Sequence, residues 1–218
     1  MTDQKESLIL GECIIHPSSK IHKGVIIGKV FRKFLDGTQE EYERTIIEEE
    51  TYIGYYSVIG TGSKIAMGAI IDDHCIIESR VIVGKKSLIT HRAQICNDVT
   101  IGEECVIGGF IGERTRIGNN CRIFGKIVHL QHNPKLGWDD DEAIEGAPNI
   151  SDGVFIGFNA IVAGNVAIGR KAYICAGSIV TRDIPELHVV SGNNTITHFT
   201  KWKGRLRHSS FFKDTPDE

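Results

Sequence analysis

The chain has 218 residues and a formal net charge of −3; this size indicates one domain (residues 1–218) with a sizeable core, and this charge argues against a general nucleic-acid binder. No apolar run is long enough to cross a membrane, and the start MTDQKESLILGEC lacks the layout of a signal peptide. The six cysteines form no CxxC pair, which favours reduced thiols in a cytoplasmic protein over a disulfide framework or a zinc site.

The first regular segment covers residues 13–28, where Ile15, Ile21 and Ile27 follow one another at intervals of six. An insertion near residues 29–50 interrupts this count. Its DGT tripeptide is typical of a hairpin turn, whereas the later QEEYERTIIEEE would also start a helix. We favour the hairpin and expect the charged side chains of the insertion to face solvent.

The main repeat covers residues 53–128 and places a β-branched aliphatic residue at every sixth position. Ten such residues share one register: Ile53, Ile59, Ile65, Ile71, Ile77, Val83, Ile89, Ile95, Ile101 and Ile107. A period of six fits neither a helix nor an alternating strand, but it fits a solenoid of short strands joined by tight corners. Glycine often follows the aliphatic residue, and we expect it to ease the turn of the backbone. The register then slips from Ile107 to Ile111, which we interpret as a shortened corner rather than a functional device.

The count stops at VHLQHNPKLGWDDDE, residues 128–142, and it resumes after the break at Ile150, Ile156, Val162, Ile168, Ile174 and Val180. A loop from about 129 to 149 therefore leaves a regular scaffold that would hold its base in place, which suits a loop that carries chemistry. Residues 150–184 complete the coils, and residues 185–218 are expected to cap the open end, as repeat folds require.

The pattern aliphatic-Gly-x-x-small-x over most of residues 13–184 resembles the hexapeptide-repeat family. The resemblance implies an all-β, left-handed parallel β-helix with three hexads in each triangular coil. Residues 145–193, EGAPNISDGVFIGFNAIVAGNVAIGRKAYICAGSIVTRDIPELHVVSGN, resemble the C-terminal coils of the coenzyme-A-dependent acyltransferases in this family. The implied reaction is acyl transfer, most simply from acetyl-CoA, to an amine or hydroxyl of a small acceptor such as a nucleotide-linked amino sugar.

In that family a histidine on the loop before these coils, often followed closely by proline, is the catalytic base, and QHNPKLG places His132 in this position. A histidine suits the role because its pKa of about 6.5 leaves much of it unprotonated at neutral pH. His129 is the nearer competitor. It falls on the next hexad step after Ile123, so we expect it to point inward or seal the last strand.

The later coils offer small residues and backbone amides to a pantetheine arm: Ala160, Ala176, Gly177 and Ser178. Cations toward the C-terminus, represented by Arg182 and Lys201, are candidates for binding the coenzyme A phosphates. The chain departs from the family at SGNNTITH, which stands where a GNP sequence is usual. The missing proline puts the implied adenine contacts in doubt.

Three residues are candidates for the acceptor side of the site. Trp138 would wall the pocket or pack the loop, and the acidic run from Asp139 would be solvated surface or attract a cationic amine. The family usually forms trimers with active sites between chains, so His91 would either reach a neighbouring subunit's loop or lie on the surface. The expected assembly is a homotrimer with a small-molecule acceptor, without metal, nucleic acid or membrane.

Two alternative functions stay open. The γ-type carbonic anhydrases share this fold and bind zinc through three histidines, and His91, His129 and His132 have roughly suitable separations. Against this, the HxxxxH pair of that family is absent from the sequence. The chain would otherwise be a non-catalytic hexapeptide assembly module, a reading that leaves the break at His132 unexplained.

Overall fold

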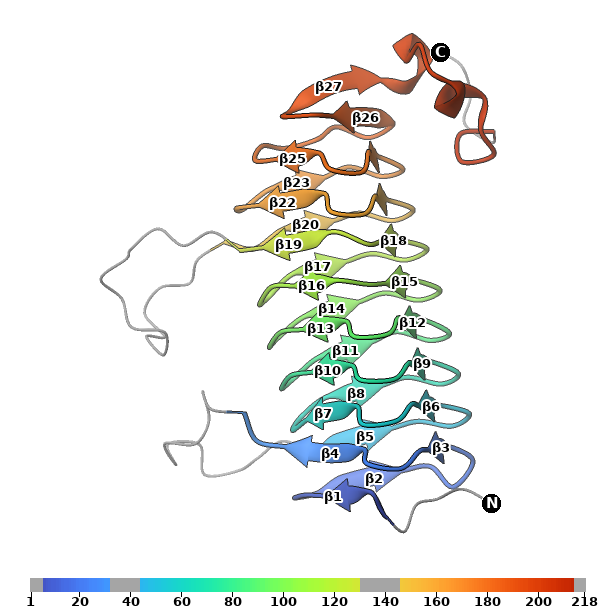
Figure 1. Cartoon of the computed structure of the whole chain (residues 1–218), viewed down its shortest axis with the longest axis vertical. Helices are drawn as coiled ribbons and strands as arrows, with labels where there is room; N and C mark the ends of the chain where they lie inside the picture. The colour runs from blue at the N-terminus through green and yellow to red at the C-terminus, as the bar shows by residue number, and fades with distance from the viewer. Residues whose placement is uncertain (1–5, 32–43, 130–145, 214–218) are drawn as a thin grey trace, which may run out of the picture.

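The computed structural model describes residues 6–31, 44–129 and 146–213, which form a solenoid of three β-sheets (Figure 1). The chain starts at one end of the stack and finishes at the other. The predicted all-β, left-handed parallel β-helix is confirmed. Among the described residues, no helix has the length and apolar character needed to span a membrane.

Sheet A contains, in spatial order, β1 (Leu8–Ile9), β4 (Ile26–Lys29), β7 (Val58–Gly60), β10 (Ile76–Ile77), β13 (Gln94–Ile95), β16 (Phe110–Ile111), β19 (Lys126–Val128), β22 (Ile161–Ala163) and β25 (Ile179–Val180). Sheet B contains β2 (Cys13–Ile15), β5 (Thr45–Ile47), β8 (Lys64–Ile65), β11 (Ile82–Val83), β14 (Thr100–Ile101), β17 (Arg116–Ile117), β20 (Asn149–Ile150) and β23 (Ala167–Ile168). Sheet C contains β3 (Lys20–Ile21), β6 (Tyr52–Ile53), β9 (Ile70–Ile71), β12 (Leu88–Ile89), β15 (Val106–Ile107), β18 (Arg122–Ile123), β21 (Phe155–Ile156), β24 (Tyr173–Ile174), β26 (His188–Ser191) and β27 (Thr195–His198). We call the turns between the sheets corners AB, BC and CA.

The six-residue period places one aliphatic side chain of each strand inside the prism. Ile59, Ile77 and Ile95 are parallel partners in successive coils of sheet A, and all three are 0% exposed. The residue before each of them points outward, as Ile76 does at 38% exposed. One continuous column of aliphatic side chains therefore fills the prism, and burial of this apolar surface is the main source of its stability.

The glycine after the aliphatic residue has a different role from the one expected. The backbone of Gly84 is not left-handed, but a Cβ atom there would lie 2.3 Å from the carbonyl oxygen of Gly102 in the next coil. Glycine at this position therefore allows the coils to approach each other. The left-handed residue of the corner comes two positions later, where Lys86 has a φ of 54° and His74 a φ of 58°.

Two corners of the solenoid are shortened. The corner between β15 and β16 contains only residues 108–109, which confirms the interpretation of the register slip. A second short corner, residues 124–125, lies between β18 and β19 and brings Ile127 into the core at 0% exposed. The expectation that His129 occupies the core step after Ile123 is therefore wrong, because Ile127 occupies it.

The insertion interrupts the solenoid over a shorter stretch than expected. Strand β4 continues to Lys29 and strand β5 begins at Thr45, so the coil resumes before residue 50. The DGT tripeptide, for which a hairpin is predicted, lies outside the described residues.

The C-terminal end of the prism is covered by the chain itself, as predicted. Strands β26 and β27 pair antiparallel, and the 3-10 helices η3 (Phe199–Lys201) and η4 (Arg205–His208) follow. Phe199 and Phe212 are 3% and 2% exposed and form a second hydrophobic cluster with Val189. The ring of Phe211 meets Tyr173 on the outer side of sheet C with centroids 5.3 Å apart. The tail is therefore a packed cap.

The six cysteines are all free thiols, and four of them are buried. Cys75 is 0% exposed, and burial raises the pKa of its thiol to about 11. A buried thiol with a raised pKa has little reactive thiolate at neutral pH, so Cys75 serves as a core residue.

The two positions of one corner lead to a first prediction. Gly84→Ala should destabilise the protein by about 1–3 kcal/mol, because the new methyl group collides with the backbone of the next coil. Lys86→Gly, in the same corner, should change stability by no more than about 1 kcal/mol, because glycine accepts the left-handed conformation without strain. Denaturant unfolding of the two variants measures the difference. A larger loss for Lys86→Gly would show that the turn conformation, and not the coil spacing, limits this position.

Candidate functional site

The segment in which the sequence places the catalytic loop leaves the prism at corner AB. The last described residue before it is His129, one residue after β19, and the chain re-enters at Gly146, shortly before β20. His132, Trp138 and Asp139 lie outside the described residues. The structure therefore fixes the two ends of the loop, which both lie at one corner of the scaffold.

His129 lies against the backbone of the preceding coil. A Cβ atom on Gly112 would lie 3.3 Å from the Nδ1 atom of His129 and 3.3 Å from its backbone nitrogen. Glycine at position 112 thus leaves room for the imidazole ring. The Nδ1 atom is buried and has no hydrogen-bond partner among the described residues.

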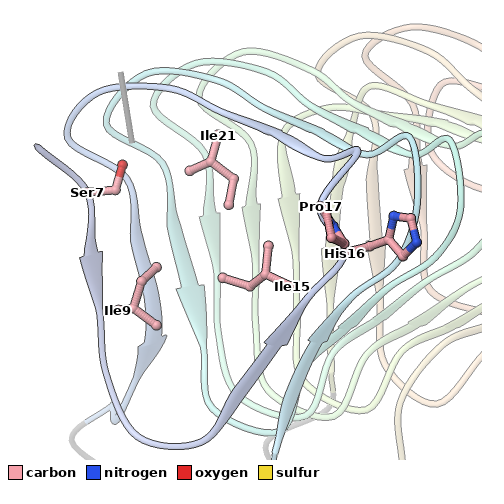
Figure 2. Close-up of a pocket in the computed structure, with 6 residues that line it drawn as sticks. All are labelled: Ser7, Ile9, Ile15, His16, Pro17 and Ile21. Atoms are coloured by element: carbon pink, nitrogen blue, oxygen red, sulfur yellow. The ribbon is translucent and has the colours of Figure 1, made fainter. Parts of the chain in front are cut away.

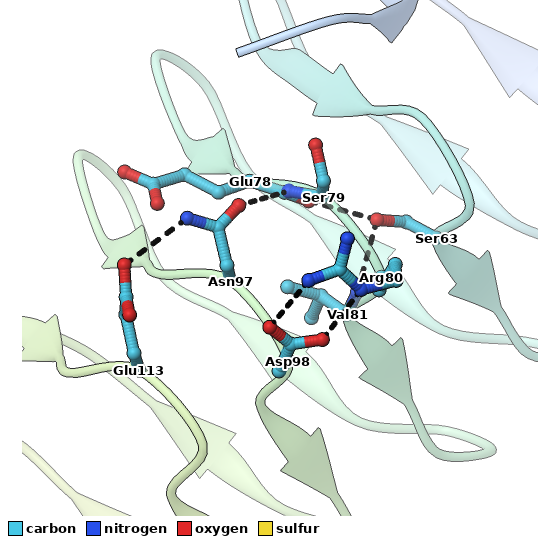
Figure 3. A network of polar contacts seen from close by, with 8 residues as sticks. All are labelled: Ser63, Glu78, Ser79, Arg80, Val81, Asn97, Asp98 and Glu113. Atoms are coloured by element: carbon cyan, nitrogen blue, oxygen red, sulfur yellow. Dashed lines mark hydrogen bonds and ion pairs between the residues drawn. The ribbon is translucent and has the colours of Figure 1, made fainter. Parts of the chain in front are cut away.

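A polar network follows the same corner through the preceding coils (Figure 3). The Asn97 side chain accepts a hydrogen bond from the Ser79 amide at 3.0 Å and donates one to Glu113 at 3.3 Å. From the same coil as Asn97, Gln94 donates to the carboxylate of Glu78 in the preceding coil at 3.2 Å. Two carboxylates are therefore held in fixed positions along corner AB below His129.

Burial changes the acid–base properties of this corner. Burial raises the pKa of Glu78, and the nearby charge of Glu113 adds to the effect, while hydrogen bonds from Gln94 and Asn97 oppose it. Burial also raises the pKa of the Cys96 thiol to about 12, with contributions from both carboxylates. The bonded residues of this network lie 16 to 18 positions apart in the sequence, so no local motif marks them.

His91 lies at a different corner from the loop. It is exposed at corner CA, where its ring meets the edge of His74 with centroids 5.6 Å apart. His74 in turn stacks on Tyr56 at 5.4 Å. Within one chain the structure does not bring His91 to His129, so the histidine set of the zinc alternative is divided between two corners. No group of three His, Cys, Asp or Glu side chains in the described part of the chain is arranged to hold a metal ion.

The four residues proposed for the pantetheine arm differ in exposure. Ala160 is 0% exposed, its amide donates to Gly157, and its carbonyl accepts from Lys126. Ser178 is also buried, with its hydroxyl 3.4 Å from the carbonyl of Val190. The polar groups of these two residues are used inside the fold.

Ala176 and Gly177 are the exposed members of this set, on the turn after β24 at corner CA. The Gly177 amide donates to the Phe158 carbonyl at 2.9 Å. Phe158 is 65% exposed and stacks on Phe124 with centroids 4.7 Å apart. A flat aromatic surface therefore lies beside a turn of small residues.

The proposed phosphate ligands lie at the capped end. Arg182 is exposed and donates to the carbonyl of Asn194 at 2.6 Å. Lys201 lines a cavity of about 530 Å³ in the C-terminal tail, together with Thr200, Trp202, Lys203, Gly204, Arg205, Arg207 and His208. The tail thus gathers four cations around one hollow that also contains an indole ring.

Comparison with known proteins places this geometry in context. No family model matches the chain. It is 33% identical over 167 residues to the bifunctional protein GlmU of Geobacillus sp., an alignment that covers 66% of this chain and 34% of that protein. It is 37% identical over 71 residues to serine acetyltransferase 4 of Arabidopsis thaliana, covering 33% of this chain and 20% of that protein. The chain spans only 20% to 37% of the lengths of the first four curated relatives.

A solved structure shows the same fold. The UDP-N-acetylglucosamine O-acyltransferase (LpxA) of Moraxella catarrhalis superposes with a TM-score of 0.57 at 17% identity, covering 87% of this chain and 72% of that one. The chain is thus a left-handed β-helix of hexapeptide repeats, and the proteins to which it is similar include serine acetyltransferases and an O-acyltransferase.

The buried carboxylate at corner AB leads to a second prediction. Because the pKa of Glu78 is raised, the folded state holds the proton of this carboxyl group more tightly than the unfolded state does. The stability of the protein therefore falls as the pH rises from the unfolded-state pKa of Glu78 through its folded-state pKa. Glu78→Gln removes that loss and keeps an oxygen that accepts from Gln94. Its stability relative to the wild type should therefore increase from about pH 4 to neutral pH, as measured by denaturant midpoints.

The matched control is Glu103→Gln, since Glu103 is an exposed acid at corner BC. The burial that raises the pKa of Glu78 is absent at this position, so the difference in midpoint from the wild type should change less with pH than it does for Glu78→Gln. A Glu78→Gln variant whose relative stability stays constant with pH would contradict the raised pKa.

Proposed function

We propose that the chain is a coenzyme-A-dependent acyltransferase that moves an acetyl group from acetyl-CoA to an amine or hydroxyl of a small acceptor. The observation that carries this proposal is the position of the break. A histidine-containing segment leaves the rigid prism at a single corner, directly before the coils that resemble those of acyltransferases. The names of the sequence relatives, which include serine acetyltransferases, support acetyl as the transferred group.

In the proposed reaction, His132 takes the proton from the acceptor as its nitrogen or oxygen attacks the thioester carbonyl. A tetrahedral intermediate forms, and a backbone N–H group stabilises its oxyanion. Collapse of the intermediate breaks the carbon–sulfur bond. The imidazolium then returns the proton to the leaving thiolate, so the histidine ends the cycle in its starting state.

The coenzyme binds, in this proposal, between the turn at Ala176 and Gly177 and the cationic cavity around Lys201. The turn offers the Ala176 amide, which has no hydrogen-bond partner among the described residues. The cavity offers charge to the phosphates of the coenzyme. Trp202 adds a ring on which adenine can stack, which would replace the contacts that the missing proline of the family leaves in doubt.

The acceptor binds near the loop, where Trp138 and Asp139 would line its pocket. An amine acceptor, such as an amino sugar, is supported by the two carboxylates at corner AB below the loop, because they favour a cation. A serine-like hydroxyl is the other acceptor that the relatives' names suggest.

The proposed assembly is a homotrimer, in which residues from two chains would meet at each site. The separation of His91 and His129 within one chain supports this, since a second chain would be needed for His91 to approach the loop. A cytoplasmic location is supported by the six free thiols.

The third prediction tests the catalytic base. His132→Ala should lower the turnover number by about two to four orders of magnitude and leave coenzyme A affinity unchanged. His129→Ala should instead cost about 1–3 kcal/mol of stability, because the ring packs on Gly112, and should retain turnover. Steady-state kinetics and denaturant unfolding of both variants separate the two roles. Loss of turnover in His129→Ala with an active His132→Ala would assign the base to His129.

The fourth prediction tests the phosphate site. Lys201→Ala should weaken coenzyme A binding in calorimetry, and the wild-type affinity should fall as salt rises, because the contacts are ionic. Lys213→Ala is the matched control, since Lys213 is exposed on the same tail but does not line the cavity. Equal coenzyme A affinities of the two variants would show that the cavity around Lys201 does not bind the coenzyme. An absence of coenzyme A binding at millimolar concentration would contradict the proposed function as a whole.

A further inference from the structure

The N-terminal end of the prism has three open strand edges. Among the described residues, strands β1, β2 and β3 are each the last strand of their sheet, and each pairs only with the strand of the next coil. In a parallel ladder, alternate residues bond to opposite neighbours. Leu8 and Leu10 donate to the next coil, so the amide of Ile9 between them is directed at the open side.

The same geometry recurs on a second sheet. Lys20 and His22 donate to the next coil, which directs the amide of Ile21 at the open side. Among the described residues, two of the three edges at this end therefore present backbone donors that bond to no other strand. Open edges of this kind are sites where another strand adds to the sheet.

The centre of this end is apolar and hollow. Ile9 occupies a core position in the register, opposite Ile27, yet it is 45% exposed because no coil of the described residues lies beneath it. A cavity of about 440 Å³ opens there, lined by Ser7, Ile9, Ile15, His16, Pro17 and Ile21 (Figure 2). Leu8 at 52% and Ile14 at 48% exposed extend the apolar surface around the rim.

The opposite end of the prism differs. There the antiparallel hairpin β26–β27 and the Phe199–Phe212 cluster cover the last coils. Repeat folds need a polar or packed cap at each end. In the part of the chain that the structure describes, the N-terminal end has neither.

Charges on the rim do not oppose a close approach of two such ends. The Glu6 carboxylate pairs with Lys23 at 2.5 Å, and Glu12 pairs with Arg44 at 3.0 Å. Each named acid of the rim is thus neutralised by a base of the same chain. Two identical rims would therefore meet without net repulsion from these groups.

We propose that the N-terminal end of this prism docks against the N-terminal end of a second copy. A two-fold axis across the junction reverses the strand direction, so the edge strands of the two copies run antiparallel and exchange their open hydrogen bonds. The occupant must offer three strand edges around an apolar centre with the same triangular spacing. A second copy of this end has that arrangement, and the contact closes on itself, so it doubles the assembly instead of forming a fibre.

The test compares two isoleucines that both point outward from sheet B. Ile14 on β2 is 48% exposed at the open end, whereas Ile82 on β11 is 45% exposed in the middle of the stack. Ile14→Glu places like charges from two copies against each other, while Ile82→Glu makes the same chemical change away from the end. Sedimentation velocity of the full chain should give a wild-type particle with twice the mass of the Ile14→Glu particle, and Ile82→Glu should match the wild type.

Leu8→Lys on β1 gives an independent check at the same end and should also halve the mass. Circular dichroism should show the same strand content in all three variants, since each changed side chain is exposed. Equal masses for the wild type and both end variants would overturn the proposal, whether another segment or a different protein covers the end. The measurement reads mass alone, so its failure is separate from a failure of acyl transfer.

Discussion

The hydrogen bonds between successive coils are the constraint on which the rest of this structure depends. They hold neighbouring strands about 4.8 Å apart, so a strand residue inside the stack has an equivalent directly above and below it. This spacing selects aliphatic residues inside the prism and forbids a Cβ atom at Gly84, where it would meet Gly102. It also means that residues distant in sequence form local groups. The network of Ser79, Asn97 and Glu113 spans three successive coils, yet each of its bonds joins direct neighbours.

The repetition made the core predictable from the sequence, and its interruptions limited the prediction. Each coil imposes the same requirement, so the isoleucine column shows directly in the spacing. The second short corner, residues 124–125, was not predicted from the sequence. It is two residues shorter than a regular corner, so the core position falls on Ile127 and not on the expected step at His129. The network at corner AB was hidden for a related reason. Asn97 and Glu113 are separated by 16 residues and not by 18, since a short corner lies between them.

The candidate site residues were harder to predict than the core, because the type of a residue does not indicate whether its side chain points into the prism or out of it. Ala160 and Ser178 are small, as a pantetheine track requires, but smallness is equally what the inside of a corner requires, and both are buried. Ala176 and Gly177 are also small residues, but they are exposed. The sequence pattern therefore located the coils that suit a coenzyme, whereas the structure was needed to distinguish their inner and outer positions. The buried carboxylate of Glu78 gave no local signal, because its environment is built from other coils.

The two ends of the described prism differ in how they are covered, and this difference determines the end at which local unfolding begins. In a one-dimensional stack each coil is stabilised only by the coils next to it, so opening starts where a neighbour is missing and proceeds coil by coil. At the C-terminal end the packed aromatic tail must detach before any coil is released. At the N-terminal end the outermost strands can fray without breaking such a cluster. Backbone amides should therefore exchange with solvent at rates that fall from β1 toward the capped coils, and the coils that flank residues 130–145 lie on the slowly exchanging side.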